Sequence, residues 1–206
     1  MSWIYFVDLF GTFVFAISGV TTAIQKKFDL VGTLVIGFIT AIGGGTLRDM
    51  LIGQFPVGWL RDRNYFIVII IGYVVAYLFK KKVLEYKKSM FLFDTIGIAL
   101  FTILGIETAI EVGLNLEICV IMGIVTACFG GVIRDIMTNE VPLVFRKEIY
   151  ASACLVGALV YVLLMEISEL RNLNILISIL SVFIIRFLSI KKGWSLNFEN
   201  RENPTS

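Results

Sequence analysis

The sequence of 206 residues contains no histidine, so the commonest general base and metal ligand is missing. Its three cysteines, Cys119, Cys128 and Cys154, lie in apolar stretches without the spacing of metal ligands, and we interpret them as small packing residues. Charged residues make up only 17% of the chain. These shortages exclude the usual hydrolase and metalloenzyme sites. We expect no enzymatic activity, no cofactor and no nucleic-acid partner.

Apolar residues, in contrast, are abundant: 58% of the chain is hydrophobic and the mean hydropathy is +0.89. A soluble domain does not bury so large a share, and the charges gather in clusters between long uncharged stretches. We therefore expect an all-α membrane protein with seven transmembrane helices. The spans lie at about Ile4–Ile24, Leu30–Ile42, Phe66–Phe79, Met90–Ile106, Ile118–Ile133, Ile149–Met165 and Leu173–Ile185.

The competing count is six spans, because the last stretch contains Arg186 and would then lie on the membrane surface. The first stretch has no basic segment before it and is long enough to span, so we expect it to be retained as a helix and not cleaved as a signal peptide.

The basic residues indicate the orientation. If seven spans alternate, one side of the membrane receives the clusters Lys26/Lys27, Lys80/Lys81/Lys82/Lys87/Lys88, Arg146/Lys147 and Lys191/Lys192. Cytoplasmic loops carry an excess of lysine and arginine. The sequence therefore predicts a multi-pass protein of the inner (plasma) membrane, with the N-terminus outside and the C-terminus in the cytoplasm.

An internal repeat appears when the chain is shifted by 86 positions. The shift aligns, without a gap, Asp8 with Asp94, Gly44-Gly45 with Gly130-Gly131, Arg48-Asp49 with Arg134-Asp135, and Pro56 with Pro142. Each copy holds three spans, an odd number, so the second copy must enter the membrane from the opposite face. Inverted repeats of this kind are typical of transporters and some channels, with the permeation site between the copies.

The repeat defines four expected regions. Residues 1–88 form the first three-helix repeat with its basic linker, residues 89–168 form the inverted second repeat, residues 169–192 form the seventh helix, and residues 193–206 form a disordered cytoplasmic tail.

The second span of each copy ends in glycines, namely Gly43, Gly44 and Gly45 in the first copy and Gly130 and Gly131 in the second. Consecutive glycines weaken a helix by about 1 kcal/mol each relative to alanine, so we expect a kink or an unwound turn. Carbonyl groups freed at membrane depth must line a cavity or contact protein, and they can bind cations. The alternative is that the glycines only permit close helix packing.

Charged pairs follow both glycine clusters, at Arg48-Asp49 and Arg134-Asp135. Charges inside a membrane are costly and tend to face water or a partner, so these pairs are candidates for lining an ion path. The alternative is a helix that ends just before the arginine, with the pair closing it locally. Asp8 and Asp94 either line the same path or favour the N-terminus of their helices.

The lysines at 80, 81, 82, 87 and 88 lie beside the membrane on the expected cytoplasmic side. They are candidates for binding anionic lipid headgroups, and the alternative is that they only set the topology.

The strings Gly43-Gly44-Gly45-Thr46-Leu47-Arg48-Asp49 and Gly130-Gly131-Val132-Ile133-Arg134-Asp135, with Asn139–Leu143 and Arg146–Tyr150, resemble the prokaryotic trimeric intracellular cation (TRIC) channels, which are also catalogued as a glycine transporter family. The resemblance covers the chain from Asp8 to about Ile190. It implies a homotrimer in which each subunit has its own pore for monovalent cations, chiefly potassium and possibly sodium. It also implies that the glycine-kinked second and fifth helices line that pore. Phe129 stands where the first copy has Gly43, which is a departure from the paired pattern.

Two functions remain open at this point. A cation channel needs weak sites, which suits backbone carbonyls and the hydroxyls of Thr40, Thr46 and Thr126. A secondary transporter of a small zwitterion such as glycine would use inverted repeats equally well. The scarcity of membrane-embedded acidic residues for coupling ions favours the channel. A scaffold is disfavoured because it gives no reason for polar residues to recur in both copies.

Overall fold

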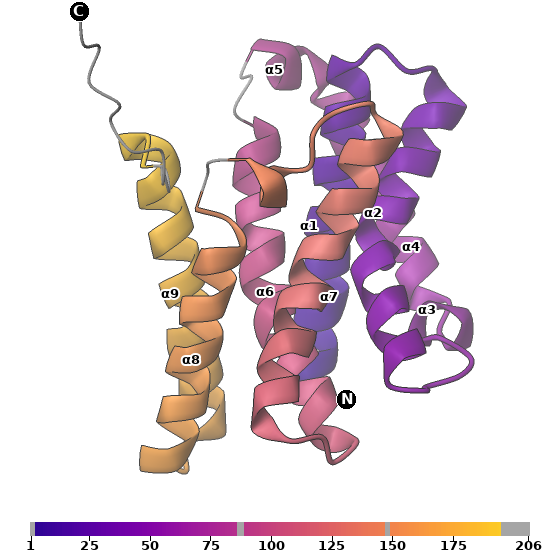
Figure 1. The fold of residues 1–206 in the computed structure, drawn as a ribbon. Coiled ribbons are helices and arrows are strands. Elements are labelled where there is room, and N and C mark those ends of the chain that lie inside the picture. The colour runs from indigo at the N-terminus through magenta and orange to yellow at the C-terminus, as the bar shows by residue number, and fades with distance from the viewer. Residues whose placement is uncertain (1–2, 86–88, 147–148, 195–206) are drawn as a thin grey trace, which may run out of the picture.

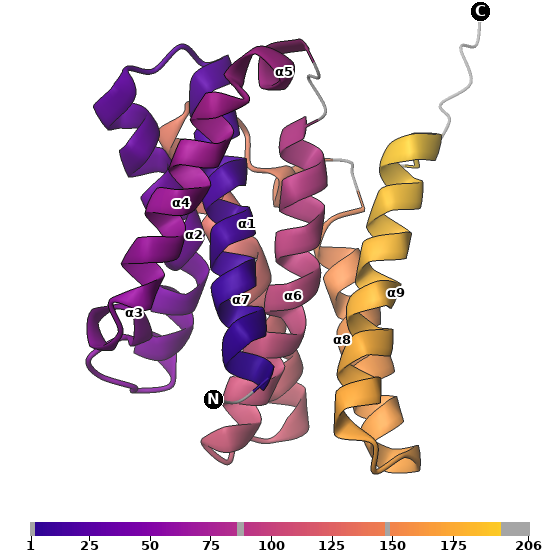
Figure 2. The same ribbon diagram turned by 180° about the vertical axis from the view of Figure 1, so that it is seen from behind.

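The structure, a computed structural model, describes residues 3–85, 89–146 and 149–194, and these contain helices but no strand. The elements follow the order α1 (Trp3–Gln25), α2 (Leu30–Leu51), α3 (Gly58–Arg61), α4 (Asn64–Leu78), α5 (Lys80–Glu85), α6 (Ser89–Glu111), α7 (Leu116–Met137), the 3-10 helix η1 (Leu143–Phe145), α8 (Ala151–Ile167) and α9 (Arg171–Lys192). The long helices lie side by side in one bundle (Figures 1 and 2).

Five helices, α1, α2, α6, α7 and α9, are long and apolar enough to cross a membrane. The helices α4 and α8 are equally apolar but have 15 and 17 residues. They rise only about 22–26 Å, less than the hydrocarbon core of about 30 Å. These seven helices correspond to the expected spans, and the short α3 and α5 are helices in segments where only connections were expected. The helix α9 runs alongside α8 and not across the end of the bundle (Figure 1).

The start of α1 and the helix α5 lie at opposite ends of the bundle (Figure 1). The turn after α1, the helix α5 and the end of α9 lie at the same end, so the described members of the basic clusters share one side. Lys87, Lys88 and Lys147 lie outside the described residues.

The internal repeat is visible in the hydrogen bonds at equivalent positions. Thr40 Oγ1 donates to the carbonyl of Ile36 at 2.6 Å, and Thr126 Oγ1 donates to that of Met122 at 2.6 Å. The turn after the first helix of each copy also uses the same backbone geometry, with positive φ at Lys27 and at Gly113. Because α1 and α6 run in opposite directions (Figure 1), the two copies are inverted.

The two copies meet along a core of equivalent helices. Phe15 on α1 stacks on Phe101 on α6, at equivalent positions, with ring centroids 5.2 Å apart. Glycines bring α2 and α7 into backbone contact, because a Cβ atom on Gly44 would lie 2.0 Å from the carbonyl oxygen of Thr126. A Cβ atom on Gly130 would lie 2.5 Å from the equivalent oxygen of the first copy.

The structure contradicts the unwound turn expected at the glycines, and it also contradicts the alternative that each helix ends just before its arginine. The helices α2 and α7 are continuous through Gly43–Gly45 and Gly130–Gly131, so there is no unwound turn at either glycine cluster. Neither helix ends before its arginine, since α2 extends to Leu51 and α7 to Met137. Close packing of the glycine surfaces supports both helices, which compensates for the low helical propensity of glycine.

Candidate functional site

The repeated charged residues form two clusters, one in each copy. The cavity cluster consists of Asp8, Arg48 and Asp49, and the buried cluster consists of their equivalents Asp94, Arg134 and Asp135. In each cluster the first helix of the copy supplies one aspartate and the second helix supplies the arginine–aspartate pair. Each arginine–aspartate pair lies in the last turn of its helix, and the ends of α2 and α7 lie toward opposite ends of the bundle (Figure 1).

The cavity cluster lines a small opening between α1, α2, α3 and α4. Arg48 donates from Nε and Nη2 to Asp49 Oδ1 at 2.9 and 2.8 Å, and Asp49 Oδ2 accepts from the amide of Gly58 at 2.7 Å. The hydroxyl of Tyr65 donates to Asp8 Oδ2 at 2.7 Å. The cavity has a volume of about 20 Å³, enough for about one water molecule. Its other lining residues include Gly45, Thr46 and Trp59.

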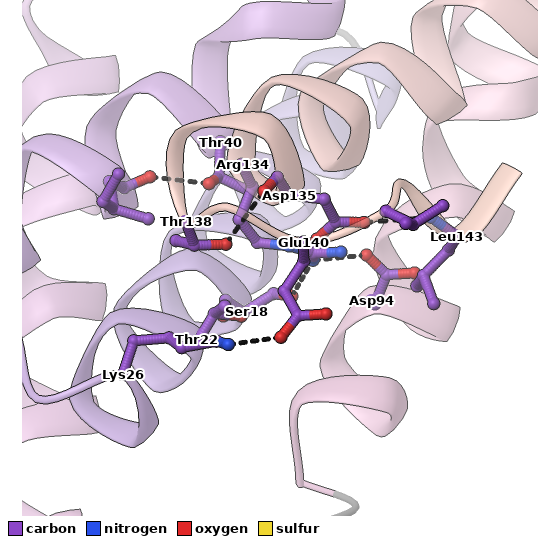
Figure 3. A network of polar contacts seen from close by, with 12 residues as sticks. Ser18, Thr22, Lys26, Thr40, Asp94, Arg134, Asp135, Thr138, Glu140 and Leu143 are labelled. Atoms are coloured by element: carbon purple, nitrogen blue, oxygen red, sulfur yellow. Dashed lines mark hydrogen bonds and ion pairs between the residues drawn. The ribbon is translucent and has the colours of Figure 1, made fainter. Parts of the chain in front are cut away.

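The buried cluster is closed by ion pairs (Figure 3). Arg134 donates from Nε to Asp135 Oδ1 at 2.8 Å and from Nη1 to Asp94 Oδ1 at 2.6 Å. The same Nη1 contacts Ser18 Oγ at 2.7 Å, which ties α1 of the first copy to the cluster. Asp135 Oδ2 accepts from the amide of Leu143 at 3.0 Å. The side chains of Asp94 and Arg134 are 0% exposed.

The two clusters have the same formal charge but different solvation. Each holds two carboxylates and one guanidinium, so the charge is −1 if both carboxylates are ionised. A buried charge is tolerated only with close partners, and removing one partner of such a pair costs about 3–5 kcal/mol. The buried cluster depends on its ion pairs for this reason, whereas the cavity cluster has room for water.

An exposed ion-pair bridge lies at the end of the bundle beyond the buried cluster (Figure 3). Glu140, in the loop after α7, pairs with Lys26 after α1 and with Arg146 at 3.0 Å. The hydrogen bond from Lys26 lowers the pKa of Glu140, and the charge of Arg146 acts in the same direction. The equivalent of Glu140 in the first copy is Gln54, so this bridge has no counterpart at the cavity end.

The glycines and threonines predicted for the site divide into two groups. Gly45 and Thr46 line the cavity, and Thr46 Oγ1 accepts from the indole nitrogen of Trp59 at 3.1 Å. Gly131 adjoins the buried cluster, since a Cβ atom there would lie 3.5 Å from Arg134 Nη2. The remaining predicted residues, Gly43, Gly44, Gly130 and Thr126, lie in the contact between helices. An ion-path role for any of these residues is still a proposal.

The described lysines of the basic linker, Lys80, Lys81 and Lys82, are exposed on α5. The ammonium of Lys80 lies 4.5 Å from the ring centroid of Tyr77. Their binding to lipid is likewise a proposal. Within the described part of the chain, no group of three or more histidine, cysteine, aspartate or glutamate side chains is placed to hold a metal ion.

Sequence reasoning missed two tyrosines, Tyr65 beside Asp8 and Tyr150 beside the buried cluster. The sequence does show their equivalence, but at a shift of 85 positions, one fewer than in the main repeat. That shift aligns Tyr65 with Tyr150 and Gly72 with Gly157. The amides that bind the two clusters, those of Gly58 and Leu143, have the same shift of 85. The connection after the second helix is therefore one residue shorter in the second copy, and an ungapped comparison loses the match there.

Comparison with known proteins places these features in a family. The sequence model described as "Glycine transporter" matches residues 5–81 and 91–166. The chain is 38% identical over 197 residues to a UPF0126 membrane protein of Vibrio cholerae, covering 95% of this chain and 82% of that protein. A UPF0126 membrane protein of Deinococcus radiodurans is 40% identical over 157 residues, covering 75% of this chain and 73% of that protein.

Solved structures agree with these sequence matches. The crystal structure of the TRIC channel orthologue from Rhodobacter sphaeroides superposes with a TM-score of 0.89 at 30% identity, covering 94% of this chain and all of that one. A second TRIC cation channel, solved to explain conductance, gives a TM-score of 0.84 at 33% identity and covers 98% of this chain and all of that one. The chain is a multi-pass membrane protein that belongs to the prokaryotic TRIC channel family, for which the matching sequence model carries the description of a glycine transporter.

Proposed function

We propose that this protein is a monovalent cation channel, chiefly for potassium, with a separate pore within each subunit of a homotrimer. In this proposal it lies in the inner (plasma) membrane, with the N-terminus outside and the C-terminus in the cytoplasm. The observation that carries the proposal is the position of the two clusters toward opposite ends of one bundle, built by equivalent residues of inverted copies. The solved TRIC cation channels with the same fold support it.

The charge of the clusters favours cations over anions. Each cluster has one carboxylate more than it has guanidinium groups, and acidic side chains along a path attract cations. A cation entering at the cavity end meets Asp8 and Asp49 before it reaches the contact between α2 and α7. The arginines keep each site from binding the ion too strongly to release it.

In this proposal the structure represents a closed conformation, and the closure lies at the buried cluster. The guanidinium of Arg134 fills the space between Asp94, Asp135 and Ser18 and is not exposed to solvent. In the proposal, conduction requires the Asp94–Arg134 pair to separate, and the exposed Lys26–Glu140 bridge must move with it.

The function is tested by recording from the purified protein in planar bilayers with a potassium chloride gradient. The proposal expects a reversal potential near that of potassium and up to three equal current levels in one channel unit. A reversal potential near that of chloride, or the absence of current from correctly folded protein, contradicts it.

The alternative is a secondary transporter of a small zwitterion such as glycine, and its specific support is the description of the matching family model. Uptake of labelled glycine into proteoliposomes separates the two functions. Saturable, gradient-driven uptake without a unitary current supports transport. Potassium flux that glycine does not change supports the channel.

A further inference from the structure

The seventh helix, α9, has no counterpart in the first copy, yet it contains a fully buried arginine. Arg186 is 0% exposed, its Nη1 donates to the carbonyl of Ile149 at 2.9 Å, and its guanidinium carbon lies 5.0 Å from the ring centroid of Tyr150. Burying a charged arginine within a membrane-spanning helix costs free energy, and such residues usually serve a function. Here it holds the two residues that immediately precede α8.

Tyr150, whose ring lies against the guanidinium of Arg186, adjoins the buried cluster. A Cβ atom on Gly131 would lie 2.8 Å from the hydroxyl oxygen of Tyr150, 3.5 Å from Arg134 Nη2 and 3.5 Å from Asp94 Oδ1. The phenol, the guanidinium and the carboxylate therefore surround the same glycine. Tyr150 therefore lies beside the Asp94–Arg134 pair that closes the proposed path, although it comes from the connection between η1 and α8.

The two equivalent tyrosines differ in what they bind. Tyr65 donates to Asp8 in the first copy. Among the described residues, the hydroxyl of Tyr150 and Asp94 Oδ2 are both buried without a hydrogen-bond partner. Burying a donor and an acceptor without partners is unfavourable, and a single hydrogen bond between these two groups would satisfy both. That hydrogen bond, from Tyr150 to Asp94, is the equivalent of the one that the first copy makes.

The cause of the difference is the position of α9. In the first copy, Gly72 on α4 packs against α1, where a Cβ atom would lie 3.0 Å from Ala16 Cβ. The equivalent Gly157 on α8 packs instead against α9, where a Cβ atom would lie 2.0 Å from Val182 Cγ2. The glycine face of α4 therefore packs on the first helix of its own copy, whereas the equivalent face of α8 packs on α9, which lies beside it (Figure 2). The helix α9 also brings the guanidinium of Arg186 onto the ring of Tyr150.

We infer that Tyr150 is a positioning residue for the proposed gate and that Arg186 on α9 controls it. With Tyr150 held under Arg186, Asp94 keeps Arg134 and the path is closed. When Tyr150 moves to donate to the unpartnered Oδ2 of Asp94, as Tyr65 donates to Asp8, the hydrogen bond reduces the negative charge that this carboxylate offers to Arg134, which weakens the ion pair and favours opening. This inference rests on the channel function proposed above and assigns to the seventh helix a role in regulation.

Three variants test the inference by single-channel recording. Tyr150→Phe removes the donor needed in the open state, so the open probability should fall about twofold to tenfold, the worth of one hydrogen bond, at unchanged unitary conductance. Arg186→Lys keeps the charge but loses the planar contact with the ring, so the open probability should rise by a similar factor. In the double variant the effect of Arg186→Lys should vanish, because it acts through Tyr150. Tyr73→Phe, on α4, is the matched control and should change nothing.

A spectroscopic measurement decides the inference independently of current. The ¹⁹F signal of 3-fluorotyrosine placed at position 150 should shift in Arg186→Lys protein, and Asp94→Asn should abolish that shift. An unchanged signal, or an effect of Arg186→Lys on gating that persists in the Tyr150→Phe background, overturns the inference. If the wild-type protein carries no current but the ¹⁹F shifts occur as expected, the channel function fails while the contact between Tyr150 and Asp94 stands.

Discussion

Replacing Arg134 by glutamine is expected to destabilise the protein much more than the same change at Arg48, although the repeat makes the two positions equivalent. Arg134 has two carboxylate partners, Asp94 and Asp135, in a site with no exposure to solvent. Its loss leaves buried carboxylates without a cation, at a cost of about 3–5 kcal/mol. Arg48 has one ion-pair partner, beside a cavity that admits water, and we expect its loss to cost about 1–2 kcal/mol.

Thermal unfolding of the purified protein in detergent, followed by the loss of the monodisperse peak in size-exclusion chromatography, measures the difference. For a chain of this size about 1 kcal/mol corresponds to about 2–4 °C in Tm. The expected decrease is therefore about 6–20 °C for Arg134→Gln and about 2–8 °C for Arg48→Gln.

A second substitution provides the control. Adding Asp94→Asn to Arg134→Gln replaces one unpaired carboxylate by an amide and should recover part of the lost stability, because the neutral pair no longer needs a counter-charge. Equal decreases for the two arginine variants, or no recovery in the double variant, would refute the assignment of the buried cluster as an ion-paired closure.

Three further changes test other parts of the structure. Gly44→Ala should destabilise the folded protein, because the new Cβ atom would lie 2.0 Å from the backbone of α7. Gly45→Ala should be neutral or raise Tm slightly, because its nearest neighbour is a side chain at 3.8 Å. Thermal unfolding of the two variants tests this difference. Glu140 has a pKa below its usual value, so its ion pairs stabilise the fold above the unfolded pKa and that contribution is lost as pH falls through the lower folded pKa. The difference in unfolding free energy between wild type and Glu140→Gln should therefore be small at neutral pH, below about 1 kcal/mol because the pairs are exposed, and should disappear in acid; Tm measured across pH follows it. Reporter domains fused after Lys88 and after Lys192 should both be cytoplasmic, and an external signal from either would contradict the proposed orientation.

The repeat was predictable from sequence because polar residues at membrane depth are rare and their positions stand out. Asp8, Arg48 and Asp49 matched Asp94 and the pair at 134–135 without a gap, and the structure gathers each set around one site. Apolar spans were found for the same reason, since uninterrupted hydrophobic length is a strong signal.

Other features depended on packing that the sequence does not display. The glycines of α2 and α7 indicated a broken helix by propensity alone, but the backbone contact between those helices keeps both continuous. The difference in solvation between the cavity cluster and the buried cluster also was not predictable, because the buried cluster is completed by Ser18, which does not belong to the matched positions. Tyr150 was hidden by a single-residue deletion between the copies.

In the proposed channel both clusters line one path across the membrane, and the current–voltage curves of Arg48→Ala and Arg134→Ala test this most directly. One charge moved through the full field is worth about 2.3 kcal/mol per 100 mV, and each arginine senses the part of the field near its own end. Because the clusters lie toward opposite ends of the bundle, the two variants should rectify in opposite directions. Identical rectification, or curves that match the wild type in both folded variants, would contradict a path through the clusters and leave the charged pairs with a structural role alone.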